Sequence, residues 1–226
     1  MRKVNNIFEH KASRILRGLL ANPGKGWSIR ALAKEIDVSV GYTHAVVASL
    51  LSLGYVIRDE TELLELVNPV GLLERWASYH QYVFANEFMD YYTYDNDIEN
   101  VLNKLRNVKV EYALTTLAGA FLVSPNVRPR TVEMYVKNKN DLKNVVVDLD
   151  LVPVEKDGNV KLVFPYDEEV FYKTQIVNGL RIVSDVQLFV DLKNYPARGV
   201  EAAENLLEDI KKQWSEYLLG VAESVR

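Results

Sequence analysis

The sequence contains no cysteine and only three histidines among its 226 residues. Without cysteine, the chain forms no disulfide, holds no thiolate-bound metal and offers no cysteine nucleophile. His10, His44 and His80 do not show the H-x-x-x-H or H-E-x-x-H spacing of zinc sites. A phosphate-binding loop, a G-x-S-x-G motif and a dinucleotide fingerprint are missing as well. These absences predict a protein without a metal or cofactor and argue against the common enzyme classes.

The chain also lacks a convincing membrane segment. One stretch of membrane-spanning length, residues 38–57, carries no formal charge. It includes serines, glycines, a threonine and a histidine, however, and its apolar residues recur at helical spacing only after Thr43. The first residues lead into a charged segment instead of the apolar core of a signal peptide. We therefore expect a soluble, cytoplasmic protein that does not contact a membrane.

An excess of positive charge is missing outside the first quarter of the chain. The net charge is −4, yet residues 1–58 contain nine Lys or Arg and three acidic residues. This is a balance of +6 and leaves −10 for the remaining residues. The basic N-terminal segment and the acidic remainder of the chain predict two domains, of which the first approaches a polyanion. Chance segregation of solvated surface charge is the alternative.

The first 68 residues show three helical patterns followed by a hairpin pattern. Ser28 and Ser39 are suitable N-caps for the second and third helices, because their hydroxyls can accept hydrogen bonds from free backbone N–H groups. Asn22-Pro23-Gly24 ends the first helix, and Gly54 ends the third. The predicted elements are helices over residues 7–20, 29–36 and 40–53 and a hairpin over residues 55–67.

This order of elements is that of the winged helix, whose third helix docks in the major groove of DNA. The segment S-I-R-A-L-A-K-E-I-D-V-S-V-G-Y-T-H-A-V-V-A-S-L-L-S-L-G-Y-V, residues 28–56, resembles winged-helix regulators. The likeness lies in the short helix, the V-S turn, the apolar positions of the third helix and the closing L-G-Y-V. We therefore predict a winged helix for residues 5–68.

In this fold, the outward face of the third helix carries no lysine or arginine. Gly41 lets the backbone come close to DNA, and Tyr42 and His44 can touch phosphates or bases. Attraction to phosphate then depends on basic residues of the second helix, the segment before it and the hairpin. The candidate DNA-binding residues are Lys25, Ser28, Arg30, Lys34, Ser39, Gly41, Tyr42, His44 and Arg58. The alternatives are a solvated helix face and a winged helix that binds a protein.

Aromatic residues are concentrated after the predicted hairpin. Residues 70–92 combine helical spacing with Trp76 and six tyrosine or phenylalanine side chains. We expect a connecting helix over residues 70–94 that packs between two domains. A contact in a homodimer is the alternative.

Residues 95–226 alternate between strand and helix patterns, which predicts a mixed α/β domain. Asn178-Gly179 is a hairpin turn, and Ser184 opens a helix through a capping box with Gln187. The last helix carries an apolar stripe from Val200 to Val221. Predicted strands cover residues 108–114, 131–136, 145–151, 160–164 and 176–183, predicted helices cover residues 116–123, 184–192 and 200–221, and residues 140–145 are expected to form a short helix or a turn.

Two groups of acidic residues imitate catalytic sites. Asp148 and Asp150 form a D-x-D pair, but the predicted strand places both on its exposed face, and no Gly-Ser turn precedes them. Asp185, Asp191 and Lys193 have the spacing of metal-dependent nucleases, but they lie on a predicted helix. We therefore expect neither catalytic nor metal-binding residues.

Several arginines of the second part have no assigned role. Arg198 and Glu201 fit the orientation of the last helix better than the binding of a ligand. Arg128 and Arg130 could form a polar surface together with Glu111, and solvated charge is the alternative.

Two segments of the second part carry a more specific resemblance. Y-A-L-T-T-L-A-G-A-F, residues 112–121, and G-L-R-I-V-S-D-V-Q-L-F-V-D-L-K-N-Y-P-A-R-G-V-E-A-A-E-N-L-L, residues 179–207, are similar to the AbiEi-type family. Its members are winged-helix antitoxins of type IV toxin–antitoxin systems and related regulators. The resemblance implies a first domain that binds repeats in its own promoter and represses it. It also implies a second domain that counteracts a nucleotidyltransferase-type toxin without forming a stable complex with it.

The sequence thus predicts an α+β protein with a winged helix-turn-helix domain over residues 1–69, a connecting helix over 70–94 and a mixed α/β domain over 95–226. We expect a non-enzymatic, DNA-binding transcriptional regulator that acts as an autorepressing antitoxin and uses no cofactor. Its expected partners are double-stranded DNA and, functionally, the toxin. The alternative is a winged-helix protein-interaction module with a second, partner-binding domain.

Overall fold

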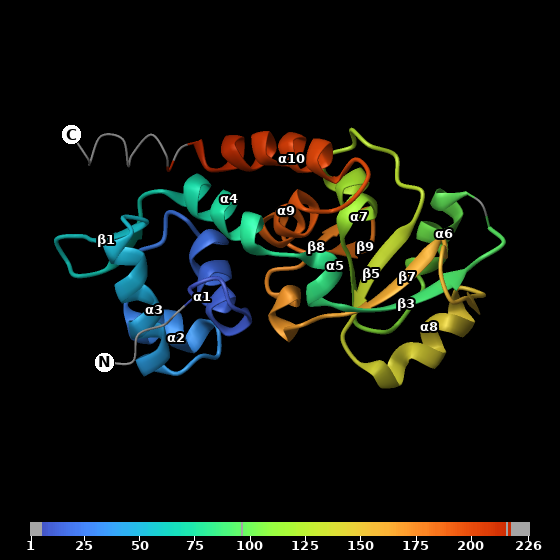
Figure 1. Ribbon diagram of the computed structural model, residues 1–226, viewed down its shortest axis with the longest axis horizontal. Coiled ribbons are helices and arrows are strands. Elements are labelled where there is room, and N and C mark those ends of the chain that lie inside the picture. The colour runs from blue at the N-terminus through green and yellow to red at the C-terminus, as the bar shows by residue number, and fades with distance from the viewer. Residues whose placement is uncertain (1–5, 96, 216, 218–226) are drawn as a thin grey trace. The chain divides into compact units, whose positions relative to one another are not determined.

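The computed structural model describes residues 6–95, 97–215 and 217 and combines helices with β-sheets (Figure 1). The chain divides into two compact units. The first unit contains the described residues up to His80 together with those from Glu208 onward. The second unit contains the described residues between Gln81 and Leu207. The predicted α+β class is confirmed.

The first unit begins with three helices, α1 (His10–Leu20), α2 (Ile29–Glu35) and α3 (Val40–Ser52). α2 begins where predicted, because the Ser28 hydroxyl accepts a hydrogen bond from the Ala31 N–H at 3.1 Å. Ser39 is the N-cap residue of α3, and Gly54 follows its end with a φ of +73°. Apolar side chains of all three helices form the core, among them Ile15, Leu16, Leu32, Ala33, Val46, Val47 and Leu50.

A hairpin follows α3, with β1 (Val56–Arg58) antiparallel to β2 (Leu64–Leu66). Trp27 extends this pairing, because its N–H and carbonyl exchange hydrogen bonds with Leu64 at 3.1 and 2.8 Å. Asp59 organises the turn by accepting hydrogen bonds from the Thr61 hydroxyl and from the backbone N–H groups of Thr61 and Leu63. The bond from the Thr61 hydroxyl, aided by the two backbone bonds, lowers the pKa of Asp59.

The predicted connecting helix over residues 70–94 is confirmed over residues 70–79, and its extension to residue 94 is wrong. Helix α4 (Pro69–Tyr79) ends at His80, whose backbone is extended with a ψ of 125°. The short helix α5 (Tyr82–Ala85) follows, and Glu87–Tyr92 form strand β3. This strand pairs over five residues with β7 (Val160–Phe164). The pairing with a distant segment explains why the aromatic residues after His80 do not continue the helix.

The last helix, α10 (Gly199–Gln213), ends within the first unit. Its apolar stripe begins at Ala203, since Val200 is 46% exposed, and Val221 lies outside the described residues. Farther on, the Tyr217 hydroxyl donates a hydrogen bond to the Leu66 carbonyl. Burial, followed by the charge of Glu65, raises the pKa of Tyr217 to about 12.

The second unit is built on a seven-stranded mixed sheet in the order β6-β3-β7-β5-β4-β9-β8. Two strand pairs, β5–β7 and β4–β9, are parallel, and the other neighbours are antiparallel. The other strands are β4 (Tyr112–Leu114), β5 (Val132–Val136), β6 (Val152–Pro153), β8 (Gln175–Val177) and β9 (Leu180–Ile182). The α-helices are the short α5, α6 (Ile98–Leu105), α7 (Thr116–Val123), α8 (Leu142–Asp148), α9 (Asp185–Lys193) and the first part of α10.

Local signals in this unit are mostly confirmed. α7 has the predicted bounds, and Asn178-Gly179 turns the β8–β9 hairpin with φ values of +51° and +77°. The Ser184 hydroxyl accepts a hydrogen bond from the Gln187 N–H at the start of α9. Of the predicted strand over residues 108–114, only Tyr112–Leu114 is a strand.

The predicted strand over residues 145–151 is wrong. Residues 142–148 form helix α8. Within it Val145 is fully buried and Val147 is 73% exposed, whereas a strand would have placed these two side chains on the same face. Three consecutive valines indicated a strand, but their burial follows the helical turn.

Candidate functional site

The predicted DNA-binding residues lie on α2, on α3 and on the segments that flank them in the first unit. α2 packs against α3, and both helices direct their apolar side chains to a common core. On the outer side of α3, Ser39, Gly41 and His44 are exposed, while Tyr42 is half-buried. Nothing lies within 4 Å of the position that a Cβ of Gly41 would occupy. The start of α3 is therefore a small, uncharged surface open to solvent.

Two basic side chains stand on the neighbouring helix. Arg30 and Lys34 are exposed and lie four residues apart, which places them on one face of α2. Within the described part of the chain, neither side chain forms an ion pair. Lys25 is positioned differently, because its ammonium group lies 3.5 Å from the centroid of the Trp27 ring. Arg30 and Lys34 are thus exposed cations that form no ion pair among the described residues and are available to an anion.

Other predicted contact residues are engaged within the protein. The Tyr42 hydroxyl donates a hydrogen bond to the Glu9 carboxylate. Burial, then this hydrogen bond and the charge of Glu9, raise the pKa of Tyr42. On the hairpin, Arg58 donates to the Glu62 carbonyl at 3.0 Å, and its guanidinium lies 3.5 Å from the Glu62 carboxylate. Ser28 has the structural role of an N-cap.

The two acidic groups of the second unit do not form the arrangement that metal-dependent catalysis requires. Asp148 is exposed at the end of α8, and Asp150 pairs with Lys104 at 3.2 Å. On α9, Asp185 accepts a hydrogen bond from Gln175 at the first turn, whereas Asp191 is fully buried. No cluster of three or more potential metal ligands occurs among residues 6–95, 97–215 and 217. The same residues contain no helix with the length and apolar character needed to span a membrane.

Sequence reasoning missed a buried polar network around Asp191. Its Oδ2 accepts hydrogen bonds from the Thr115 hydroxyl at 2.6 Å and the Tyr135 hydroxyl at 3.1 Å. Its Oδ1 accepts a hydrogen bond from the Gln187 amide at 2.7 Å. With its oxygens bonded in this way, Asp191 serves the architecture of the unit.

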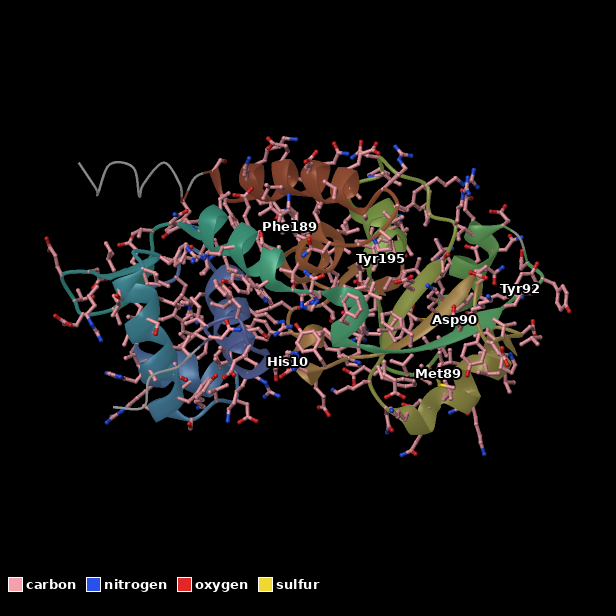
Figure 2. All side chains as sticks on the ribbon, viewed as in Figure 1. His10, Met89, Asp90, Tyr92, Phe189 and Tyr195 are labelled. Atoms are coloured by element: carbon pink, nitrogen blue, oxygen red, sulfur yellow. The ribbon has the colours of Figure 1, made fainter. Side chains whose placement is uncertain are left out.

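A second buried carboxylate, Glu133 on β5, is 1% exposed. It accepts hydrogen bonds from the Tyr82 hydroxyl at 2.9 Å and the Tyr195 hydroxyl at 2.7 Å, and the Lys161 ammonium lies 3.6 Å away. Figure 2 labels Tyr195, which follows α9 in the chain. Alternation along V-E-M-Y-V, residues 132–136, would place Glu133 on the exposed face of a strand, but all five residues are buried. The sequence pattern therefore did not indicate a buried carboxylate.

The hydrogen bonds from tyrosine hydroxyls to Glu133 should make the stability of the second unit decrease at high pH. Burial, then the charge of Glu133, raises the pKa of Tyr82 well above its usual value. In the unfolded chain the same hydroxyl ionises near pH 10. Above that pH the unfolded state loses a proton that the folded state retains, so stability decreases as pH rises.

Below about pH 9, ionisation of Tyr82 should not change the free energy of unfolding. Above pH 10, it should lower this free energy by up to about 1.4 kcal/mol per pH unit. Urea titrations between pH 8 and 11 measure this slope. Tyr82→Phe should make it shallower by up to that amount, while Tyr94→Phe, at an exposed position, should leave it unchanged. Equal slopes in the wild type and Tyr82→Phe would contradict the assignment.

Comparison with known proteins identifies the family of the chain. A family model described as a transcriptional regulator, the AbiEi antitoxin of type IV toxin–antitoxin systems, matches residues 65–211. This range includes α4 and all of the second unit, and it is well over half of the chain. No curated protein and no solved structure matches the chain.

Proposed function

Because this chain belongs to the AbiEi antitoxin family of transcriptional regulators in type IV toxin–antitoxin systems, we propose that its first unit is a winged helix that binds and represses its own promoter. α3 enters the major groove, and the hairpin β1–β2 is the wing. The second unit then provides antitoxin activity without catalysis, against a toxin of the nucleotidyltransferase type. The matched range begins at residue 65, so the proposal for α2 and α3 depends on their own surface.

The observation that carries the DNA-binding proposal is the combination of two adjacent helices with different surfaces. α3 offers Ser39, Gly41 and His44 without any charged side chain, and α2 offers Arg30 and Lys34 without intramolecular ion pairs in the described residues. A small, uncharged helix can approach base edges, while the two cations bind the phosphates beside the groove. Tyr42 contributes its aromatic ring to the DNA contact, since its hydroxyl is hydrogen-bonded to Glu9.

Arg30→Ala should weaken binding to every duplex sequence, because a phosphate contact carries no sequence information. The slope of log affinity against log salt concentration should become shallower by about 1. The measurement is binding to the duplex upstream of the gene and to a scrambled duplex at several salt concentrations. Arg75→Ala, which removes an exposed arginine of α4, is the matched control and should keep the wild-type slope. An unaltered slope for Arg30→Ala would refute the phosphate contact.

Gly41→Ala separates folding from recognition. The added methyl group meets open space in the protein, and alanine is a better helix former than glycine. Stability should therefore be unchanged or higher by up to about 1 kcal/mol. Affinity for the upstream duplex should nevertheless fall by roughly tenfold or more, which corresponds to at least 1.4 kcal/mol, because the methyl group blocks close approach of the helix backbone.

The control for Gly41→Ala is Ser52→Ala, at an exposed position near the other end of α3. It should bind DNA like the wild type. If Gly41→Ala also binds the upstream duplex with wild-type affinity, α3 does not approach DNA through its first turn. If the wild type shows no salt-sensitive binding to any duplex, the first unit is instead a protein-contact module.

A further inference from the structure

The second unit contains a cavity of about 550 Å³ whose wall carries three arginines. Arg128 and Arg130 lie between α7 and β5, and Arg198 lies between α9 and α10. The wall also contains Leu117 from the first turn of α7, and Tyr195 from the segment after α9 (Figure 2). Two segments that are distant in the sequence therefore bring their arginines to one cavity, which none of the functions derived above uses.

The positive charge of this cavity is only weakly neutralised. None of the described residues that line it is acidic. Arg198 pairs with Glu201 on α10, and Arg128 lies 3.6 Å from Asp97, but the side chains of both pairs are about half exposed or more. Such exposed pairs contribute little, so an anion can replace the carboxylates. Within the described residues Arg130 forms no ion pair at all.

The wall residues indicate the chemistry of the ligand. A guanidinium group binds phosphate oxygens through two parallel hydrogen bonds, and three such groups can hold more than one phosphate. Leu117, Val127 and the half-buried Tyr195 add apolar and aromatic surface, which suits a flat ring. The volume lies within the range of small-molecule sites. We propose that this cavity binds a nucleoside polyphosphate, with its phosphates at the arginines and its base against the apolar wall.

Phosphates of a nucleic-acid backbone share part of this chemistry. A duplex presents sugar and phosphate at its surface and keeps its bases stacked, so it would leave the apolar wall uncovered. The wall therefore favours a free nucleotide. This site belongs to the second unit alone and is independent of the DNA-binding proposal for α2 and α3.

Isothermal titration of the full chain with ATP, GTP, CTP, UTP and pyrophosphate tests the proposal. At least one nucleoside triphosphate should bind, and more tightly than pyrophosphate. Arg130→Gln should weaken its binding by roughly ten- to a hundredfold, as expected for a lost hydrogen bond to a charged group. Arg130→Lys keeps the charge and loses the paired hydrogen bonds, so its affinity for the nucleotide should lie between those of the wild type and Arg130→Gln. Arg181→Gln, on β9 and outside the cavity wall, should bind like the wild type.

Several results would overturn the proposal. They are the absence of binding by all four nucleotides at millimolar concentration, equal affinity for pyrophosphate, and the same loss in Arg181→Gln as in Arg130→Gln. A loss of duplex binding by Arg130→Gln, without any nucleotide binding by the wild type, would assign the arginines to the nucleic-acid backbone. Far-UV circular dichroism establishes that each variant is folded. Failure here leaves the promoter-binding proposal intact, because that proposal is tested on duplex DNA with Arg30→Ala.

Discussion

Asp191→Ala is expected to lower the free energy of unfolding of the second unit by about 3–5 kcal/mol. The substitution removes a fully buried acceptor and leaves the donors of Thr115, Tyr135 and Gln187 behind. A buried donor that loses its acceptor also loses the compensation for its desolvation, at a cost of about 1–3 kcal/mol. The methyl side chain of alanine accepts no hydrogen bond from any of the three donors, and the vacated space adds a cavity.

The positions of the tryptophans allow this loss to be assigned to one unit. Trp27, Trp76 and Trp214, the three tryptophans of the chain, all belong to the first unit. Their fluorescence therefore follows the unfolding of the first unit, while near-ultraviolet circular dichroism of tyrosine includes the second. Asp191→Ala should shift the tyrosine transition to lower denaturant concentration more than it shifts the tryptophan transition.

Two variants separate the buried network from a general loss of negative charge. Asp148→Ala removes an exposed aspartate at the end of α8 and should change stability by no more than about 0.5 kcal/mol. Asp191→Asn keeps the shape and one acceptor oxygen, so it should lose less than the alanine variant. A loss below about 1 kcal/mol for Asp191→Ala would show that the network adds little to the stability of the unit.

Elements that are defined by neighbouring residues could be predicted from the sequence. The caps at Ser28 and Ser184 satisfy backbone groups three residues away, and Asn178-Gly179 fixes its own turn. Residues 87–92 could not be assigned in this way. Their aromatic side chains fit a helix or a strand, and the pairing of Phe88 with Val163 across the sheet decides between the two.

The candidate sites follow the same division. The exposure of Arg30 and His44 could be predicted, because the order of helices determines which faces point inward. The hydrogen bond between Tyr42 and Glu9 joins residues on separate elements, so no local pattern indicates it. The sequence likewise favours solvated charge for Arg128 and Arg130 and a role in orienting the last helix for Arg198, and only the fold shows that all three line one cavity.

Trp76→Ala should destabilise the first unit by about 3–5 kcal/mol, the usual cost of removing a large aromatic side chain from a core. Trp76 lies on α4 and is fully buried. Its ring centroid is 5.1 Å from the guanidinium carbon of Arg17, which is 2% exposed and donates a hydrogen bond to the Ser13 hydroxyl. Without the ring, a buried cation on α1 loses its aromatic neighbour as well as its packing.

Trp76→Phe is the matched control for this prediction. Phenylalanine retains most of the apolar contact and removes the Trp76 indole N–H, which is buried and has no hydrogen-bond partner among the described residues. It should therefore lose much less stability than alanine, because the smaller ring is partly offset by the removal of an unsatisfied donor. The fluorescence of Trp27 and Trp214 reports both variants, and the tyrosine transition of the second unit is the internal reference. If Trp76→Ala leaves the tryptophan transition near its wild-type position, the indole ring does not support Arg17 and the α1–α4 contact owes its stability to other side chains.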